Sequence, residues 1–171
     1  MQMVKKYLLW LFVLWFAFLF FMPKPELYYA LERELAKQDI KLNESSIEEG
    51  VLYLTIRDVK VYVKGIELAK IESIHFFTLL GYSSVELKQV EVDDLLKSKV
   101  PKNIEKVFAS HNIFSPFSLS LDANGSFGVA KGRLSLVDNN VSVKLVEAND
   151  IDTLKPFMKQ DEEGWYYEAS F

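Results

Sequence analysis

Residues 51–64 read VLYLTIRDVKVYVK, and their alternation decides the fold that we predict. Apolar side chains occupy the even positions at residues 52–56, which is typical of a strand that buries one face. After Asp58 the apolar side chains occupy the odd positions at residues 59–63 instead. A change of parity would turn the apolar side chains to solvent unless the strand contains a bulge or a short turn, and we favour a bulge.

Similar alternation continues on both sides of this segment and predicts an antiparallel meander with one apolar and one polar face. Glycines interrupt it at Gly65 and Gly81, and Asn124-Gly125 and Asp138-Asn139-Asn140 predict tight turns. The further predicted strands are residues 40–43, 66–80, 85–92, 117–121, 126–137, 141–146 and 164–171.

Three segments have helical rather than alternating spacing. Leucines recur every four residues at residues 26–38, which predicts an amphipathic helix. Apolar residues at three- and four-residue spacing predict helix at residues 93–112, and residues 151–159 predict a short helix. The predicted class is therefore α+β, mainly β: a curved antiparallel sheet with two or three short helices and a subdivision near residues 94–112.

The N-terminal segment, residues 7–22, reads YLLWLFVLWFAFLFFM and contains no charge. As a helix it would rise about 24 Å, which is short against a hydrocarbon core of about 30 Å. A cleaved signal peptide is the alternative, but no small-x-small cleavage site follows. We therefore expect a single transmembrane anchor at residues 1–22, and Lys5 and Lys6 predict a cytoplasmic N-terminus.

The predicted organisation follows from this anchor. Residues 23–25 are a linker, and residues 26–171 form a periplasmic β-rich domain of a single-pass inner-membrane protein. The net charge of −4 disfavours nucleic acid as a partner. The chain contains no cysteine, so its stability depends on an ordinary apolar core.

The sequence offers no catalytic, cofactor-binding or metal-binding constellation, and we expect no enzyme and no cofactor. The only histidines are His75 and His111, and no other histidine or cysteine lies at ligand spacing. No nucleophile elbow is present, and the adjacent acidic residues at 93–94 and 161–163 lack the alternation of a calcium loop. Asn124 lies within an acid-extended N-glycosylation sequon and is a candidate modification site; a simple turn is the alternative.

Three stretches share a pattern of apolar strands separated by glycines: residues 51–62 (VLYLTIRDVKVY), 65–74 (GIELAKIESI) and 125–136 (GSFGVAKGRLSL). Together with an N-terminal anchor and a helix, this pattern resembles the N component of type II secretion systems and related AsmA-like envelope proteins. The resemblance implies strands and glycine turns repeated into a curved sheet. It implies a non-enzymatic component of a secretion-type envelope machine.

On this hypothesis the partners are the membrane and other envelope proteins, which dock through exposed strand edges. Large aromatic residues near a terminus often anchor interfaces. The candidate contact residues are therefore Trp165, Tyr166, Tyr167 and Phe171, although they could equally complete the core.

The alternative is a module that handles lipid or lipopolysaccharide on an apolar concave face; a scaffold subunit of a motility motor is a third option. The candidate lipid-facing residues are Leu119, Leu121, Leu134, Leu136, Val141, Val143 and Leu145. Helices at residues 26–38 and 94–111 that cover this face would favour the scaffold, and an uncovered face would favour lipid.

Overall fold

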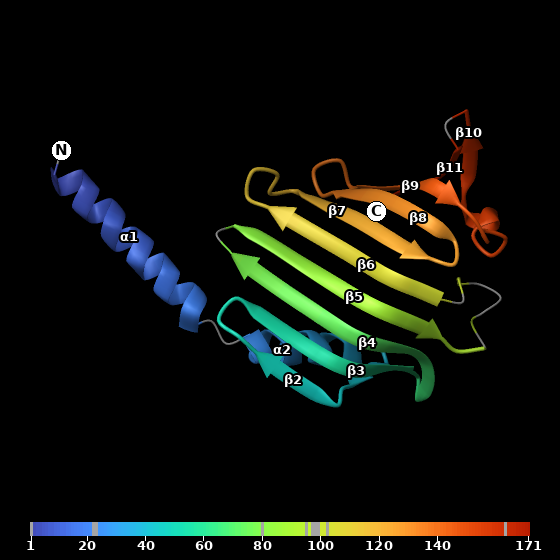
Figure 1. Ribbon diagram of the computed structural model, residues 1–171, viewed down its shortest axis with the longest axis horizontal. Coiled ribbons are helices and arrows are strands. Elements are labelled where there is room, and N and C mark those ends of the chain that lie inside the picture. The colour runs from blue at the N-terminus through green and yellow to red at the C-terminus, as the bar shows by residue number, and fades with distance from the viewer. Residues whose placement is uncertain are drawn as a thin grey trace.

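A computed structural model describes residues 2–21, 24–79, 81–94, 96, 100–101, 103–162 and 164–171. Its main feature is one antiparallel sheet of eleven strands in the order β1-β3-β4-β5-β6-β7-β8-β9-β11-β10, with β2 beside β3 (Figure 1). The strands are β1 Ile40–Asn43, β2 Ser46–Glu49, β3 Tyr53–Val63, β4 Ile66–Leu79, β5 Tyr82–Val92, β6 Asn103–Asn112, β7 Ser118–Gly125, β8 Gly128–Ser135, β9 Asn140–Ala148, β10 Lys159–Asp161 and β11 Gly164–Ser170.

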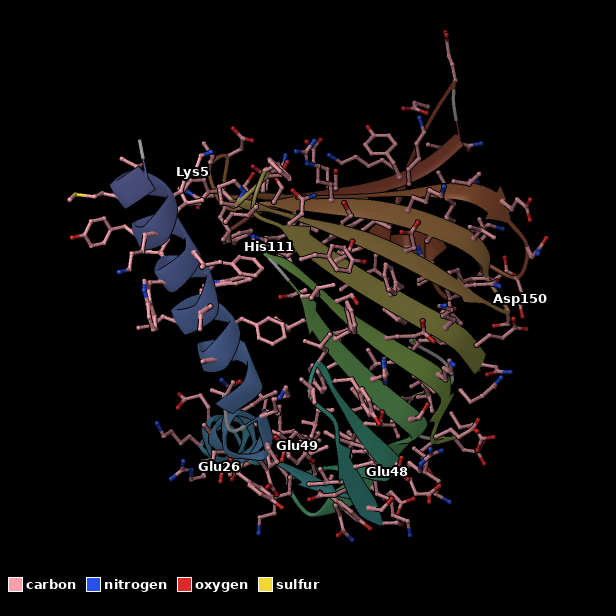
Figure 2. All side chains as sticks on the ribbon, turned by 60° about the vertical axis from the view of Figure 1, so that its left-hand side comes forward. Lys5, Glu26, Glu48, Glu49, His111 and Asp150 are labelled. Carbon is pink, nitrogen blue, oxygen red and sulfur yellow. The ribbon has the colours of Figure 1, made fainter. Side chains whose placement is uncertain are left out.

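The helical elements lie at different places relative to this sheet. The amphipathic helix expected at residues 26–38 is confirmed as α2, Lys24–Ala36, which packs beside the β2–β4 end (Figure 1). The short helix expected at residues 151–159 is reduced to one 3₁₀ turn, η1, Lys155–Phe157. The first helix, α1, Gln2–Phe21, stands away from the sheet with its described side chains largely exposed (Figures 1 and 2).

The expectation of a transmembrane anchor is corrected. Across the described ranges, no helix is both long enough and apolar enough to cross a membrane. Gln2, Lys5 and Lys6 occupy the start of α1, so its uncharged portion is about 15 residues, or about 22 Å of helix. The predicted single-pass inner-membrane location depended on this anchor and is corrected with it. Residues 1 and 22–23 of the expected anchor and linker lie outside the described residues.

The predicted α+β class is also wrong, because the helix expected at residues 93–112 is mostly the strand β6. Residues 95, 97–99 and 102 of that prediction lie outside the described part. The pairing of β6 with β7 shifts between Ile104 and Lys106. This irregularity lets Ile104 and Val107 reach the same face although they are three residues apart, so a bulged strand imitates helical spacing.

The turn predicted at Asn124-Gly125 is displaced by two residues. Both residues belong to β7, and Gly125 pairs with Gly128 across a turn formed by Ser126 and Phe127. Gly128 has φ of 98°, a backbone conformation that glycine adopts without strain. The turn expected at residues 138–140 is confirmed, with Asn139 at φ 47° just before β9.

Candidate ligand-binding face

One face of the sheet is apolar across eight strands, and we call it the inner face because α2 packs on it. The cross-strand pairing aligns its side chains into two rows without a charged residue. The first row is Leu54, Phe76, Val85, Ala109, Leu121, Gly132, Val143 and Tyr167; the second is Ile56, Ile74, Leu87, Val107, Ala123, Ala130 and Leu145. Figure 2 shows the sheet arched, with α2 at its lower end.

The inner face is covered at both ends. At one end, Tyr28 of α2 packs into a buried cluster with Leu54, Ile56, Val59, Ile71 and Ile74. At the other end, the segment that follows β9 folds back, so that Ile151 joins Phe127, Ala130 and Leu145 in a second buried cluster. Burying large aliphatic side chains in these clusters stabilises the fold by roughly 1.5–3 kcal/mol each.

Between the two clusters the inner face is only half-buried. Ala109 and Leu121 keep partial exposure in the middle of the first row, while Val85 and Val143 on either side are partly exposed and pack against the first and the second cluster. In the described chain α2 contacts the sheet at β1 and β2, and no helix packs along β5, β6, β7 or β8. The middle of the face is therefore an open apolar surface between two covered ends.

The structure brings most of the predicted lipid-facing residues together on this surface. Leu119, Leu134 and Val141 pair across β7, β8 and β9 and are half-buried on the inner face beside Leu121 and Val143. Leu145 is buried at the covered end. Leu136 lies in the turn after β8, where its side chain is exposed, so it is not part of the face.

A pocket of about 170 Å³ opens under α2 at the edge of the inner face. Its walls are Lys24, Leu27, Tyr28 and Leu31 from α2, Val51, Leu52 and Leu54 around the start of β3, and Phe76 and Thr78 from β4. An apolar cavity of about 150 Å³ is known to hold benzene, so this pocket accommodates a short hydrocarbon segment. The Lys24 ammonium lies 3.8 Å from Glu49 Oε1.

Tyr28 lines this pocket and links α2 to the loop beside the sheet. Its hydroxyl donates a 3.0 Å hydrogen bond to Glu44 Oε2, which joins α2 to the loop between β1 and β2. Burial, with the hydrogen bond to Glu44 as the second cause, raises the pKa of Tyr28 above its ordinary value of 10.0. The phenol is therefore neutral at physiological pH and acts as a stable donor.

The opposite, outer face is polar. His75 Nδ1 lies 2.8 Å from Thr55 Oγ1, and its ring stacks on Tyr53. Two lysines reach Glu86, with Lys106 Nζ at 2.7 Å and Lys88 Nζ at 3.0 Å. The Lys106 hydrogen bond is the largest influence that lowers the pKa of Glu86.

Neither histidine belongs to a candidate metal site among the described residues. His111 Nε2 lies 3.1 Å from the Pro116 carbonyl, at the end of β6. Among the described residues, no group of three or more His, Asp or Glu side chains could hold a metal ion.

The remaining predicted site residues lie at the C-terminal edge and on β7. Trp165 packs against the second cluster, and Tyr166 pairs with Lys144 of β9 and Lys159 of β10. Tyr167 and Phe171 are exposed. Asn124 is exposed in β7, and its Nδ2 donates to Glu105 Oε2 at 3.4 Å. Partner contact and glycosylation at these residues stay predictions.

The pocket under α2 and the continuity of the two rows were not predicted from the sequence. The alternation of each strand could identify its apolar side chains, but the pairing register decides which of them align. The sequence signals available for the pocket were the leucine stripe of α2 and the apolar Val51. Neither of them indicates where α2 packs on the sheet.

Comparisons of this chain with protein-family models, with curated proteins and with solved structures find no match.

Proposed function

We propose that this chain is a non-enzymatic lipid-handling module whose inner face receives an acyl chain. The observation that carries the proposal is the pair of uncharged rows that crosses the sheet and stays open between its covered ends. Apolar side chains left half-exposed over several strands are unfavourable in water, and a bound hydrocarbon chain would remove them from it.

The pocket under α2 supports the same proposal. It continues the first row, because Leu54 and Phe76 belong to both. Its volume of about 170 Å³ is too small for a whole lipid and suits a terminal part of an acyl chain. The proposed ligand therefore lies along the row and places its chain end under α2.

The scaffold role in an envelope machine was the first hypothesis from the sequence, and helices that cover the apolar face would favour it. α2 covers one end, and β6 stands where the second covering helix was expected. By the criterion set from the sequence, this arrangement favours a lipid module over a scaffold.

The test is photo-crosslinking of the full-length protein with a long-chain fatty acid that carries a photoreactive group in its chain. We expect labelled peptides from β5 to β9, and competition by unlabelled fatty acid. Labelling of the exposed α1 is disregarded, because any apolar probe can adsorb there.

Neighbouring residues on opposite faces provide matched variants. Leu121→Asp and Val143→Asp place a charge on the inner face and should abolish sheet labelling, whereas Ser120→Asp and Ser142→Asp on the outer face should preserve it. Ala109→Trp fills the row without adding a charge and should also block labelling. It provides the test if the aspartate variants fail to fold. Equal labelling of all folded variants, or labelling of α1 alone, would refute the proposal.

A further inference from the structure

The two edges of the sheet differ in how they are protected. At the β1–β2 edge, short strands carry Glu48 and Glu49, which Figure 2 labels, together with Lys41. Arg57 Nε pairs with Glu48 Oε1 at 3.2 Å. Short, charged edge strands prevent pairing with other chains. At the opposite edge, β10 covers only residues 164–166 of β11, so that residues 167–170 have no strand outside them in the described structure.

The direction of the backbone groups along this free edge follows from one hydrogen bond. The Phe171 N–H donates to the Asn139 carbonyl at 3.0 Å, on the side of β9. Because hydrogen-bonding direction alternates along an antiparallel strand, Ala169 and Tyr167 also turn their backbone groups toward β9. Glu168 and Ser170 therefore direct their N–H and C=O groups outward.

We infer that this edge pairs with the same edge of a second copy, antiparallel and about a two-fold axis at Ala169. In this register Glu168 of each copy lies opposite Ser170 of the other, and their outward groups form four backbone hydrogen bonds. Ala169 lies opposite Ala169 of the second copy at a non-hydrogen-bonded position, where the backbones approach closely and a small side chain fits.

The side chains suit this register. Tyr167 and Phe171, both exposed, lie opposite each other across the new pair of strands, so two aromatic pairs form, one on each side of the axis. A register centred on Glu168 would place two like charges opposite each other and would form only two hydrogen bonds, because β10 already pairs with Tyr166.

The inference is independent of lipid binding, but it has a consequence for the inner face. The two-fold axis is perpendicular to the sheet, so both inner faces lie on the same side. Since Tyr167 and Ala169 belong to that face, the two open apolar surfaces would lie on the same side of the dimer, with the covered ends of the second cluster between them.

The absence of cysteine from the sequence permits a site-specific test in the full-length protein. At a non-hydrogen-bonded antiparallel pair the Cα atoms are about 4.5 Å apart, within disulfide reach. Ala169→Cys should therefore give a disulfide-linked dimer under mild oxidation, seen at twice the chain mass without reductant. The cross-linking is carried out in a non-ionic detergent, which covers α1 and suppresses chance association through that helix.

Three variants complete the test. Glu168→Cys should not cross-link, because its counterpart is two positions away along the paired strands. In the Ala169→Cys background, Ser170→Pro removes one outward N–H and should reduce cross-linking severalfold, whereas Ser170→Ala keeps that N–H and should not. Cross-linking of Glu168→Cys in place of Ala169→Cys would overturn the register. A monomer by analytical ultracentrifugation with no cross-linking at either position would overturn the dimer.

Discussion

Asp58 in β3 and Gln89 in β5 both adopt a left-handed backbone conformation, with φ of 52° and 49°, on the two strands that flank β4. The pairs on either side place both residues level with Glu72 of β4. The registers are the same before and after this level, so no strand gains a residue. The parity change expected as a bulge at Asp58 is therefore a pair of left-handed residues, and it keeps both Ile56 and Val59 in the core.

This relationship predicts an unusual sensitivity at an exposed position. Asp58→Val should destabilise the fold by about 1–2 kcal/mol, because a β-branched side chain resists positive φ. Glu72→Val, at the same level of β4 and also exposed, should change stability by less than about 0.5 kcal/mol. Chemical denaturation of both variants measures the difference. Equal effects would mean that Asp58 is not held in the left-handed conformation.

Tyr28 should contribute to stability in two separable ways. Tyr28→Phe removes the hydrogen bond to Glu44 and should cost about 1 kcal/mol. Tyr28→Ala also removes a buried ring and should cost about 3–5 kcal/mol. Denaturant midpoints for the two variants provide the test. If Tyr28→Phe is as damaging as Tyr28→Ala, the packing of α2 depends on the hydroxyl rather than on the ring.

Two glycines with positive φ should respond differently to the same substitution. Gly65 has φ of 83° and nothing within 4 Å of an added Cβ, so Gly65→Ala should cost about 1–2 kcal/mol from backbone strain alone. At Gly128 an added Cβ would overlap the Glu147 carbonyl oxygen. Gly128→Ala should therefore lower the melting temperature clearly more than Gly65→Ala, and a smaller shift would place the β8–β9 contact elsewhere.

The Glu86 cluster predicts a pH-dependent contribution to stability. The pKa of Glu86 is lowered in the folded state, first by Lys106, from an ordinary value of 4.5. The contribution is therefore complete above about pH 4.5 and disappears as the pH falls through the lower folded-state pKa.

Glu86→Gln should accordingly reduce stability at pH 7 by a few tenths to about 1 kcal/mol and have little effect near pH 2. Denaturation curves at the two pH values measure this difference. Lys106→Met should remove most of the same pH dependence, because it deletes the nearer lysine. A Glu86→Gln effect that is equal at both pH values would contradict the assigned cause.

Local chemistry in the sequence determined several elements of this protein. The leucine stripe at residues 26–38 predicted α2, the alternation at residues 51–64 predicted β3, and Gly65 and Gly81 marked turns that the structure confirms. Each of these signals depends on side-chain periodicity or on backbone freedom within a few residues, so it can be recognised without knowledge of the fold.

Tertiary structure alone decided the rest. The irregularity between Ile104 and Lys106 turned an apparently helical spacing into β6. Strand pairing aligned the apolar residues into the inner face and left the β11 edge open. Register is a long-range property, because it joins residues that no local pattern relates, and the candidate site depends on it.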